Sequence, residues 1–231
     1  MISINRREML GITAGMAVAS TGLLSGCQMI GKEQTVKTDN FKKLKNADFY
    51  DAQGNLLADK AAQAYYEMMR YHNYPVYDVL KTEEFWAIDF GLKNFSECGM
   101  AGIFWCNDYE DRYFGHEIYL LPGQMIVEHR HMKTEKAGPK MEAWQVRHGS
   151  IWTFGEGEES PEFAKLCPPI HKNIAKARNV TELKPGMLNK LDVAETWHFM
   201  LAGPEGAIVT EYANYHDNDG LRFQHPDAIL G

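Results

Sequence analysis

Residues 123–131 read GQMIVEHRH, and after a loop residues 142–149 read EAWQVRHG; these two runs decide the fold. Alternate residues of a strand face the same side of a sheet, so His129 and His131 are expected to point into one cavity. A carboxylate on the next strand can complete three sides of a metal site. Such imidazole and carboxylate ligands suit a divalent first-row cation that keeps positions open for a substrate. The two runs therefore predict a metalloenzyme on a β-barrel.

Two carboxylates compete for the third position. Glu135 precedes the turn formed by residues 137–139, whereas Glu142 follows it and begins the returning strand. A residue beyond the turn can lie opposite the His-x-His strand, so Glu142 is the expected ligand. The fourth ligand should come from a distant strand, and His198, flanked by bulky apolar residues, is the best remaining histidine.

The other histidines fit a simpler interpretation, because a single histidine in a strand is more often a core or surface residue than a ligand. We expect this of His72, His116, His171, His216 and His225, and leave His148 open because it precedes Gly149 at a strand end.

Length and charge limit the classes of protein to which the chain can belong. A chain of 231 residues favours one domain with embellishments and is long enough to bury a core. The formal net charge is −7, and there is no sizeable basic block outside the far N-terminus. A nucleic-acid partner is not expected, because phosphate binding needs clustered Lys and Arg.

The N-terminus has the features of an export signal. Arg6 and Arg7 precede a short apolar run from Ile12 to Leu24, and Leu-Ser-Gly-Cys closes it at Cys27. This pattern resembles a twin-arginine signal with a bacterial lipoprotein cleavage site. We expect residues 1–26 to be the signal, Cys27 to carry a lipid anchor as the only membrane attachment, and the protein to be periplasmic or cell-envelope bound. The alternative is an uncleaved amphipathic start.

The remaining cysteines give no disulfide framework. Cys98, Cys106 and Cys167 are odd in number and lack the spacing of zinc ligands. Free thiols are expected, although pairing of Cys98 with Cys106 stays open.

The residue pattern changes at about Gly91. Before it we expect a polar spacer over 27–45 and a helical extension over 46–90, with one helix from Asp59 to about Tyr71 and a second from Thr82. After it, short β-branched and aromatic runs alternate with turns. The expected strands are 100–107, 112–121, 125–132, 141–148, 150–155, 187–192, 197–202 and 206–213. This number of short strands favours a mainly β jelly roll or similar barrel over 91–231.

The spacing of the candidate ligands resembles a known motif. Gly123-x5-His129-x-His131-x10-Glu142-x6-Gly149 resembles the first cupin motif with a lengthened hairpin. The second cupin motif is less complete: Gly186 and His198 are present, but residues 192–194 replace the usual Pro-x-Gly. The resemblance implies a cupin double-stranded β-helix with an N-terminal helical extension.

Within the cupins, the chain is similar to the D-lyxose ketol-isomerase family over about residues 85–226. The matching stretches are Asp89-Phe90-Gly91 with Asn94-Phe95, Leu121-Pro122-Gly123-Gln124, Glu128-His129-Arg130-His131, Lys140-Met141-Glu142, Ala202-Gly203-Pro204-Glu205-Gly206-Ala207 with Thr210-Glu211, and Arg222-Phe223. This similarity implies a homodimeric, manganese-dependent isomerase that converts D-lyxose to D-xylulose by proton transfer through a metal-stabilised enediolate.

An isomerase also needs groups that move protons. Glu211, near the end of a strand, is the expected base, and the family places a carboxylate there. Lys140 shares a strand face with Glu142 and could polarise a substrate oxygen or donate the second proton. Asp219 and Arg222 could bind sugar hydroxyls at the mouth. The alternatives are a solvated Glu211 and a surface Lys140.

Two other functions fit part of the pattern. A ferrous cupin oxygenase shares the ligand set, and a carbohydrate-binding lipoprotein needs no proton shuttle. Glu211 and Lys140 together favour the isomerase. The ligand set alone does not select manganese over iron, cobalt or zinc.

Overall fold

The structure is a computed structural model that describes residues 45–230. The expected signal (1–26) and all but the last residue of the expected spacer (27–45) lie outside the described residues. Among the residues described, no helix is long and apolar enough to cross a membrane.

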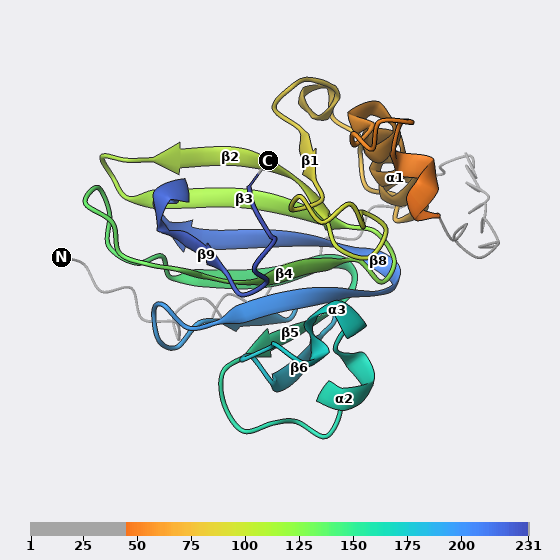
Figure 1. The fold of residues 1–231 in the computed structure, drawn as a ribbon. Helices are drawn as coiled ribbons and strands as arrows, with labels where there is room; N and C mark the ends of the chain where they lie inside the picture. Colours follow the sequence, from red (N-terminus) through yellow and green to blue (C-terminus); the bar gives the residue numbers. More distant parts are fainter. Residues whose placement is uncertain (1–44, 231) are drawn as a thin grey trace, which may run out of the picture. The chain divides into compact units, whose positions relative to one another are not determined.

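Strands dominate the described part of the chain, as expected for a mainly β protein (Figure 1). The strands are β1 (Trp86–Ile88), β2 (Met100–Asp108), β3 (Tyr113–Leu120), β4 (Met125–His131), β5 (Glu142–Gly155), β6 (Asn179–Leu183), β7 (Leu188–Lys190), β8 (His198–Asn214) and β9 (Leu221–Phe223). The helices are α1 (Ala58–Tyr71), α2 (Phe163–Leu166) and α3 (Pro169–Lys172), with 3₁₀ turns η1 (Asn46–Phe49), η2 (Asp78–Lys81) and η3 (Asn218–Gly220).

Helix α1 forms close to where the sequence predicts it. It begins one residue before Asp59, which lies in the first turn, where its negative charge favours the helix dipole. The three-and-four spacing of its apolar residues produces a buried face that packs on the outside of the sheet; this face comprises Ala61, Ala64, Tyr65, Tyr66, Met68 and Met69. Tyr65 also donates a hydrogen bond to the buried Gln124 side chain at 2.7 Å, which ties the helix to the loop before β4.

The predicted second helix is wrong. The η2 turn ends at Lys81, and the Thr82 hydroxyl donates to the carbonyl of Val79 at 2.7 Å, which closes the turn. The chain then extends into β1, where Trp86 pairs with Gly102 of β2. The segment expected to be a helical extension therefore supplies an edge strand, because Trp86–Ile88 gains ladder hydrogen bonds and packing from β2.

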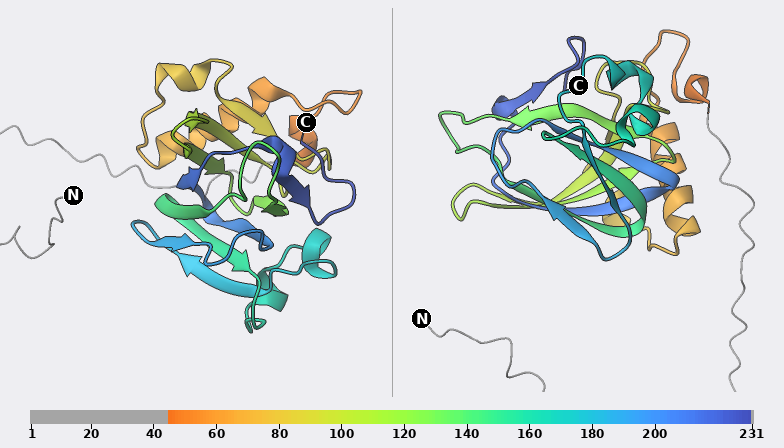
Figure 2. Two further views of the ribbon diagram at one scale, coloured as in Figure 1. Left: turned by 90° about the vertical axis from the view of Figure 1, so that its left-hand side faces the viewer. Right: turned by 90° about the horizontal axis from the view of Figure 1, so that it is seen from below.

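All strand pairs of the nine-stranded sheet are antiparallel in the described residues, and β8 pairs with β3, β4 and β5. The strands curl around a common interior (Figure 2). Strand β5 covers the two predicted strands 141–148 and 150–155. Strand β8 likewise covers the predicted strands 197–202 and 206–213.

A close approach of two glycines bends this pair of long strands. Gly149 pairs with Ala207, but Ile151 pairs with Ala202, so residues 203–206 lie between these pairings. Gly149 has a φ of +69°, and a Cβ there would overlap the carbonyl oxygen of Gly206. Glycine is therefore required at 149, where the register shifts and the sheet turns.

Two apolar cores result. One fills the interior between the curled strands and includes Trp144, Val146, Phe154 and Phe199. The other lies between α1 and the outer face of the sheet, where Tyr119 and Ile208 are fully buried. Cys98, Cys106 and Cys167 are free thiols, and Cys106 is half-buried.

Candidate active site

Four residues far apart in sequence meet at one end of the interior. His129 and His131 lie on β4, Glu142 is the first residue of β5, and His198 is the first residue of β8. Strand pairing brings them together, because His129 is directly opposite His198 in the β4–β8 ladder. One ligand atom from each of the four lies within 4.8 Å of all the others. The structure thus assembles the four residues predicted as ligands, and the choice of Glu142 over the exposed Glu135 agrees with it.

Backbone carbonyls fix the orientation of two imidazole rings. His129 Nδ1 lies 2.8 Å from the carbonyl oxygen of Val127, and His198 Nδ1 lies 2.9 Å from that of Thr196. A carbonyl only accepts, so each Nδ1 carries a proton and, in the neutral ring, each Nε2 keeps its lone pair. Each ring is thereby held in the tautomer that ligates a cation through Nε2.

Glu142 lies between two of the rings. Its Oε1 is 2.9 Å from His131 Nε2, and its Oε2 is 3.0 Å from His198 Nε2. Buried His198 Nε2 has no well-formed hydrogen bond among the described residues. An imidazole lone pair that faces a carboxylate oxygen without a proton between them is the arrangement expected of two ligands that share a cation.

The protonation states of these residues also favour binding of a cation. Burial and the neighbouring histidines hold the pKa of His129 well below its usual value, and burial lowers the pKa of His131. Burial alone would raise the pKa of Glu142, but the Lys140 charge and His131 outweigh it and hold that pKa well below its usual value. Neutral imidazoles and an ionised carboxylate are the donor set that binds a divalent first-row cation. The residues present fit such a cation.

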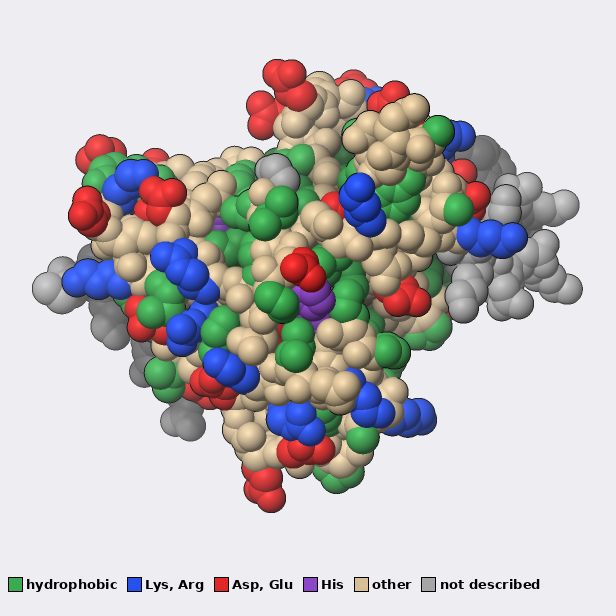
Figure 3. All heavy atoms as spheres, viewed as in Figure 1, with side chains coloured by type: hydrophobic (Ala, Val, Ile, Leu, Met, Phe, Trp, Pro, Cys, Tyr) green, Lys and Arg blue, Asp and Glu red, His purple; other side chains and the backbone are tan. Residues whose placement is uncertain are grey.

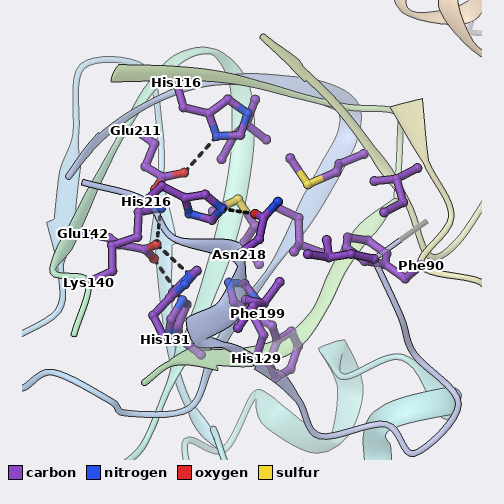
Figure 4. Close-up of a pocket in the computed structure, with 18 of the residues that line it drawn as sticks. Phe90, His116, His129, His131, Lys140, Glu142, Phe199, Glu211, His216 and Asn218 are labelled. Atoms are coloured by element: carbon purple, nitrogen blue, oxygen red, sulfur yellow. Dashed lines mark hydrogen bonds and ion pairs between the residues drawn. The ribbon is translucent and has the colours of Figure 1, made fainter. Parts of the chain in front are cut away.

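A second cluster adjoins the first. Lys140 Nζ lies 2.7 Å from Glu142 Oε1 and also donates to Glu211 Oε1. Glu211 Oε2 in turn lies 3.0 Å from His116 Nδ1. Burial alone would lower the pKa of Lys140, but its two carboxylate partners outweigh burial and raise that pKa. The cluster is a buried chain of hydrogen-bonded titratable groups beside the candidate ligands (Figure 4).

His116 is the member of this cluster that the sequence did not single out, since it was expected to be a core or surface histidine. It is buried on β3, directly opposite Glu211 in the β3–β8 ladder. Nothing in the local sequence distinguishes it, because its role depends on the register between two strands that are 95 residues apart.

Both clusters line one cavity of about 380 Å³. His216 and Asn218 also line it, which departs from the expectation of a core or surface position for His216. The remaining histidines, His72, His148, His171 and His225, do not line it.

Asp219 and Arg222, which were expected to line the mouth, are not among the residues that line this cavity. Asp219 is exposed and pairs with Lys136 at 2.8 Å, and Arg222 donates to backbone carbonyls on the outside of β9. Side chains alternate along a strand, so the neighbours of Arg222, Leu221 and Phe223, face the cavity instead.

Solved structures with similar folds include L-ribose isomerases. The L-ribose isomerase of Cellulomonas parahominis without ligand aligns with a TM-score of 0.60 at 14% identity, covering 80% of this chain and 96% of that one. The Acinetobacter sp. DL28 L-ribose isomerase in complex with L-ribose aligns with a TM-score of 0.55 at 14% identity, covering 73% and 82%. These alignments confirm the expected fold, a mainly β cupin double-stranded β-helix.

Sequence relatives are closer. No family model matches the chain. The D-lyxose/D-mannose isomerase of Thermosediminibacter oceani is 31% identical over 138 residues, which are 60% of this chain and 75% of that enzyme. The D-lyxose ketol-isomerase of Cohnella laeviribosi is 32% identical over 126 residues, which are 54% and 68%. On this identity and coverage, the chain belongs to the D-lyxose ketol-isomerase family and is a sugar isomerase.

Proposed function

We propose that the protein is a metal-dependent aldose–ketose isomerase that converts D-lyxose to D-xylulose, with Mn²⁺ as its cation. The observation that carries this proposal is the contact between two clusters in one cavity, at which Lys140 links Glu142 to Glu211. The substrate follows the names of the sequence relatives, two of which are D-lyxose ketol-isomerases.

The cation would be held by the four residues at the ends of β4, β5 and β8, namely His129, His131, Glu142 and His198. When bound, it supplies Lewis-acid stabilisation of the negative charge that develops on the substrate oxygens of the enediolate. Manganese rests on the family resemblance, because three imidazoles and a carboxylate accept several first-row cations.

Isomerisation also requires two proton movements, one between carbons 1 and 2 and one between their oxygens. Burial alone would raise the pKa of Glu211, but the charge of Lys140 outweighs it and lowers that pKa, so the carboxylate is ionised and can accept the carbon-bound proton. Lys140 can donate to a substrate oxygen.

The two roles are coupled. If a substrate oxygen takes over the hydrogen bond from Lys140, Glu211 loses the group that most lowers its pKa and becomes a stronger base. Such a carboxylate–ammonium pair beside the candidate ligands favours an isomerase over an oxygenase.

The test is a manganese-supplemented assay of the purified protein against a panel of aldoses and ketoses, with D-lyxose to D-xylulose as the first pair. We expect turnover that a chelator abolishes and added Mn²⁺ restores. Turnover that persists after complete metal removal would refute metal dependence. If another sugar were the preferred substrate, the proposed substrate, D-lyxose, would be refuted and the isomerase function would stand.

We further propose that residues 1–26 direct export by the twin-arginine route, that Cys27 carries a lipid anchor, and that the protein acts as a homodimer. The Arg6-Arg7 pair supports the export and the Leu-Ser-Gly-Cys run supports the anchor, while the dimer rests on the family resemblance. Cell fractionation of the natural sequence and of Cys27→Ser tests the anchor, because only the natural sequence should remain with membranes. Light scattering tests the dimer.

A further inference from the structure

The two ends of the cavity differ in chemistry. Figure 4 shows Glu211, Lys140 and Glu142 at one end and Phe90 at the opposite end, with Asn218 between them. The end around Phe90 is apolar, since Phe223 packs edge-on against Phe90 at a centroid distance of 5.7 Å and Ile88, Ile126 and Leu230 also line the cavity.

This apolar end offers few partners for hydroxyl groups. Apart from the candidate ligands, the Lys140 cluster and the indole N–H groups of two tryptophans, the polar side chains among the described lining residues are His216 and Asn218. These two bond to each other, with His216 Nε2 2.6 Å from Asn218 Oδ1, which leaves His216 Nδ1 and the Asn218 amide nitrogen as their remaining polar atoms. A sugar hydroxyl buried against the apolar side chains without a partner would cost about 1–3 kcal/mol.

The apolar lining also continues to the surface. Leu230 lines the cavity and is 40% exposed, and the Ile229 N–H donates to the carbonyl of Phe90 at 3.0 Å, which holds the C-terminal segment there. Figure 3 shows hydrophobic side chains gathered on this face beside the C-terminal end of the chain. A group larger than a sugar could thus extend outward along apolar side chains.

The reaction fixes which end of the substrate meets these side chains. Aldose–ketose interconversion needs a free carbonyl at carbon 1 or 2, and those atoms must lie at the candidate ligands and Glu211. A substituent on carbon 1 would block the reaction, so only the far end of the sugar can reach the region around Phe90. A cavity of about 380 Å³ falls within the roughly 300–1,000 Å³ of sites that hold drug-sized ligands.

We propose that the substrate is a sugar whose end distant from the carbonyl carries an apolar substituent, an aryl, alkyl or acyl group, which binds against Phe90, Phe223 and Leu230. This inference rests on the proposed isomerase function: it keeps the reaction and the lyxose configuration, and makes unsubstituted D-lyxose the slower substrate. Burial of the substituent contributes about 25 cal/mol per Å² of apolar surface removed from water.

The experiment compares D-lyxose with 5-O-benzyl-D-lyxose, whose ether resists hydrolysis, on the manganese-loaded full-length protein. The expected result is a kcat/KM at least tenfold higher for the ether. Leu230→Asn keeps a similar volume but places an amide at the apolar end, so it should reduce the ratio of the two kcat/KM values. Leu188→Asn, the same change at an exposed leucine of β7, should leave that ratio unchanged.

The outcomes separate the two proposals. Turnover of D-lyxose with a kcat/KM equal to or above that of the ether overturns the apolar substituent and leaves the isomerase intact. Turnover of neither sugar refutes the isomerase function. Calorimetry then decides the inference by comparing the binding of 5-O-benzyl-D-lyxitol with that of the unsubstituted alditol. Tighter binding of the benzyl compound that Leu230→Asn removes supports it, and equal or undetectable binding of both overturns it.

Discussion

His116 Nδ1 lies 3.0 Å from Glu211 Oε2, and both side chains are buried in the cavity that holds the candidate ligands. Trp86 stacks on the His116 ring at a centroid distance of 5.5 Å, so the ring has little freedom to rotate. His116 therefore holds the carboxylate of Glu211 from the side opposite to Lys140.

We expect His116→Gln to lower kcat by roughly 10- to 100-fold, as loss of an orienting partner commonly does. KM and bound metal should change little, because His116 is not among the four candidate ligands. Steady-state kinetics and metal analysis measure these quantities. A matching loss of metal would show that His116 acts through the cation site instead.

Glu211→Gln should retain the cation and lower kcat by roughly 100- to 10,000-fold, the range that general acid–base groups supply. The amide keeps the shape of the side chain but has no basic oxygen. Exchange of the carbon-2 hydrogen with solvent, followed by NMR, reports proton abstraction directly. Exchange at the natural rate in the variant would remove Glu211 as the base.

Glu142→Ala should abolish metal retention and activity together, because Glu142 contacts His131, His198 and Lys140. Glu135→Ala provides the matched control, since it deletes an exposed carboxylate in the preceding loop. Metal content after dialysis distinguishes the two variants. Full metal occupancy in Glu142→Ala would contradict the ligand assignment.

The candidate ligands could be predicted from the sequence because they lie in short-range patterns. The alternation of His129 and His131 and the position of Glu142 after a turn can be read without tertiary information. Alternation gave no such help at β9, where Arg222 was chosen although its neighbours face inward. Strand β9 is only three residues long, which is too short for an alternating pattern to predict it.

Other features depend on strand register and could not be predicted locally. His116 reaches Glu211 only because β3 pairs with β8 in one register. The merger of predicted strands into β5 and β8 has the same cause, since glycines that resemble turn signals instead bend continuous strands. Strand β1 forms because β2 offers it a partner, which outweighs the helix signal from Thr82 to Glu84.

The bend at Gly149 gives a stability prediction. Gly149→Ala should lower the free energy of unfolding by about 3 kcal/mol or more, because it combines a positive φ with overlap against the Gly206 carbonyl. Gly138→Ala is the control, since a Cβ there meets nothing within 4 Å. Denaturant unfolding of both variants measures the difference. Equal stability of the two would show that the strands can bend with a side chain at 149.

His171 gives a prediction on pH. Burial, reinforced by His225, lowers the pKa of His171 from 6.5 to about 4, and its Nε2 accepts the Glu128 N–H at 3.0 Å in the neutral form. In the unfolded chain the ring takes up a proton near pH 6.5, whereas the folded protein resists this until about pH 4. The unfolded state therefore binds more protons in this window, and stability falls as pH falls through it.

At about 1.36 kcal/mol per pKa unit, the loss between pH 6.5 and 4 amounts to roughly 3 kcal/mol. His171→Gln removes the titrating ring, so its free energy of unfolding should fall less steeply than that of the natural protein over the same range. Glu128, whose pKa burial raises, acts in the opposite direction but is present in both proteins, so it does not alter the comparison. Urea unfolding at half-unit pH steps measures both slopes, and equal slopes would mean that His171 is protonated in the folded protein.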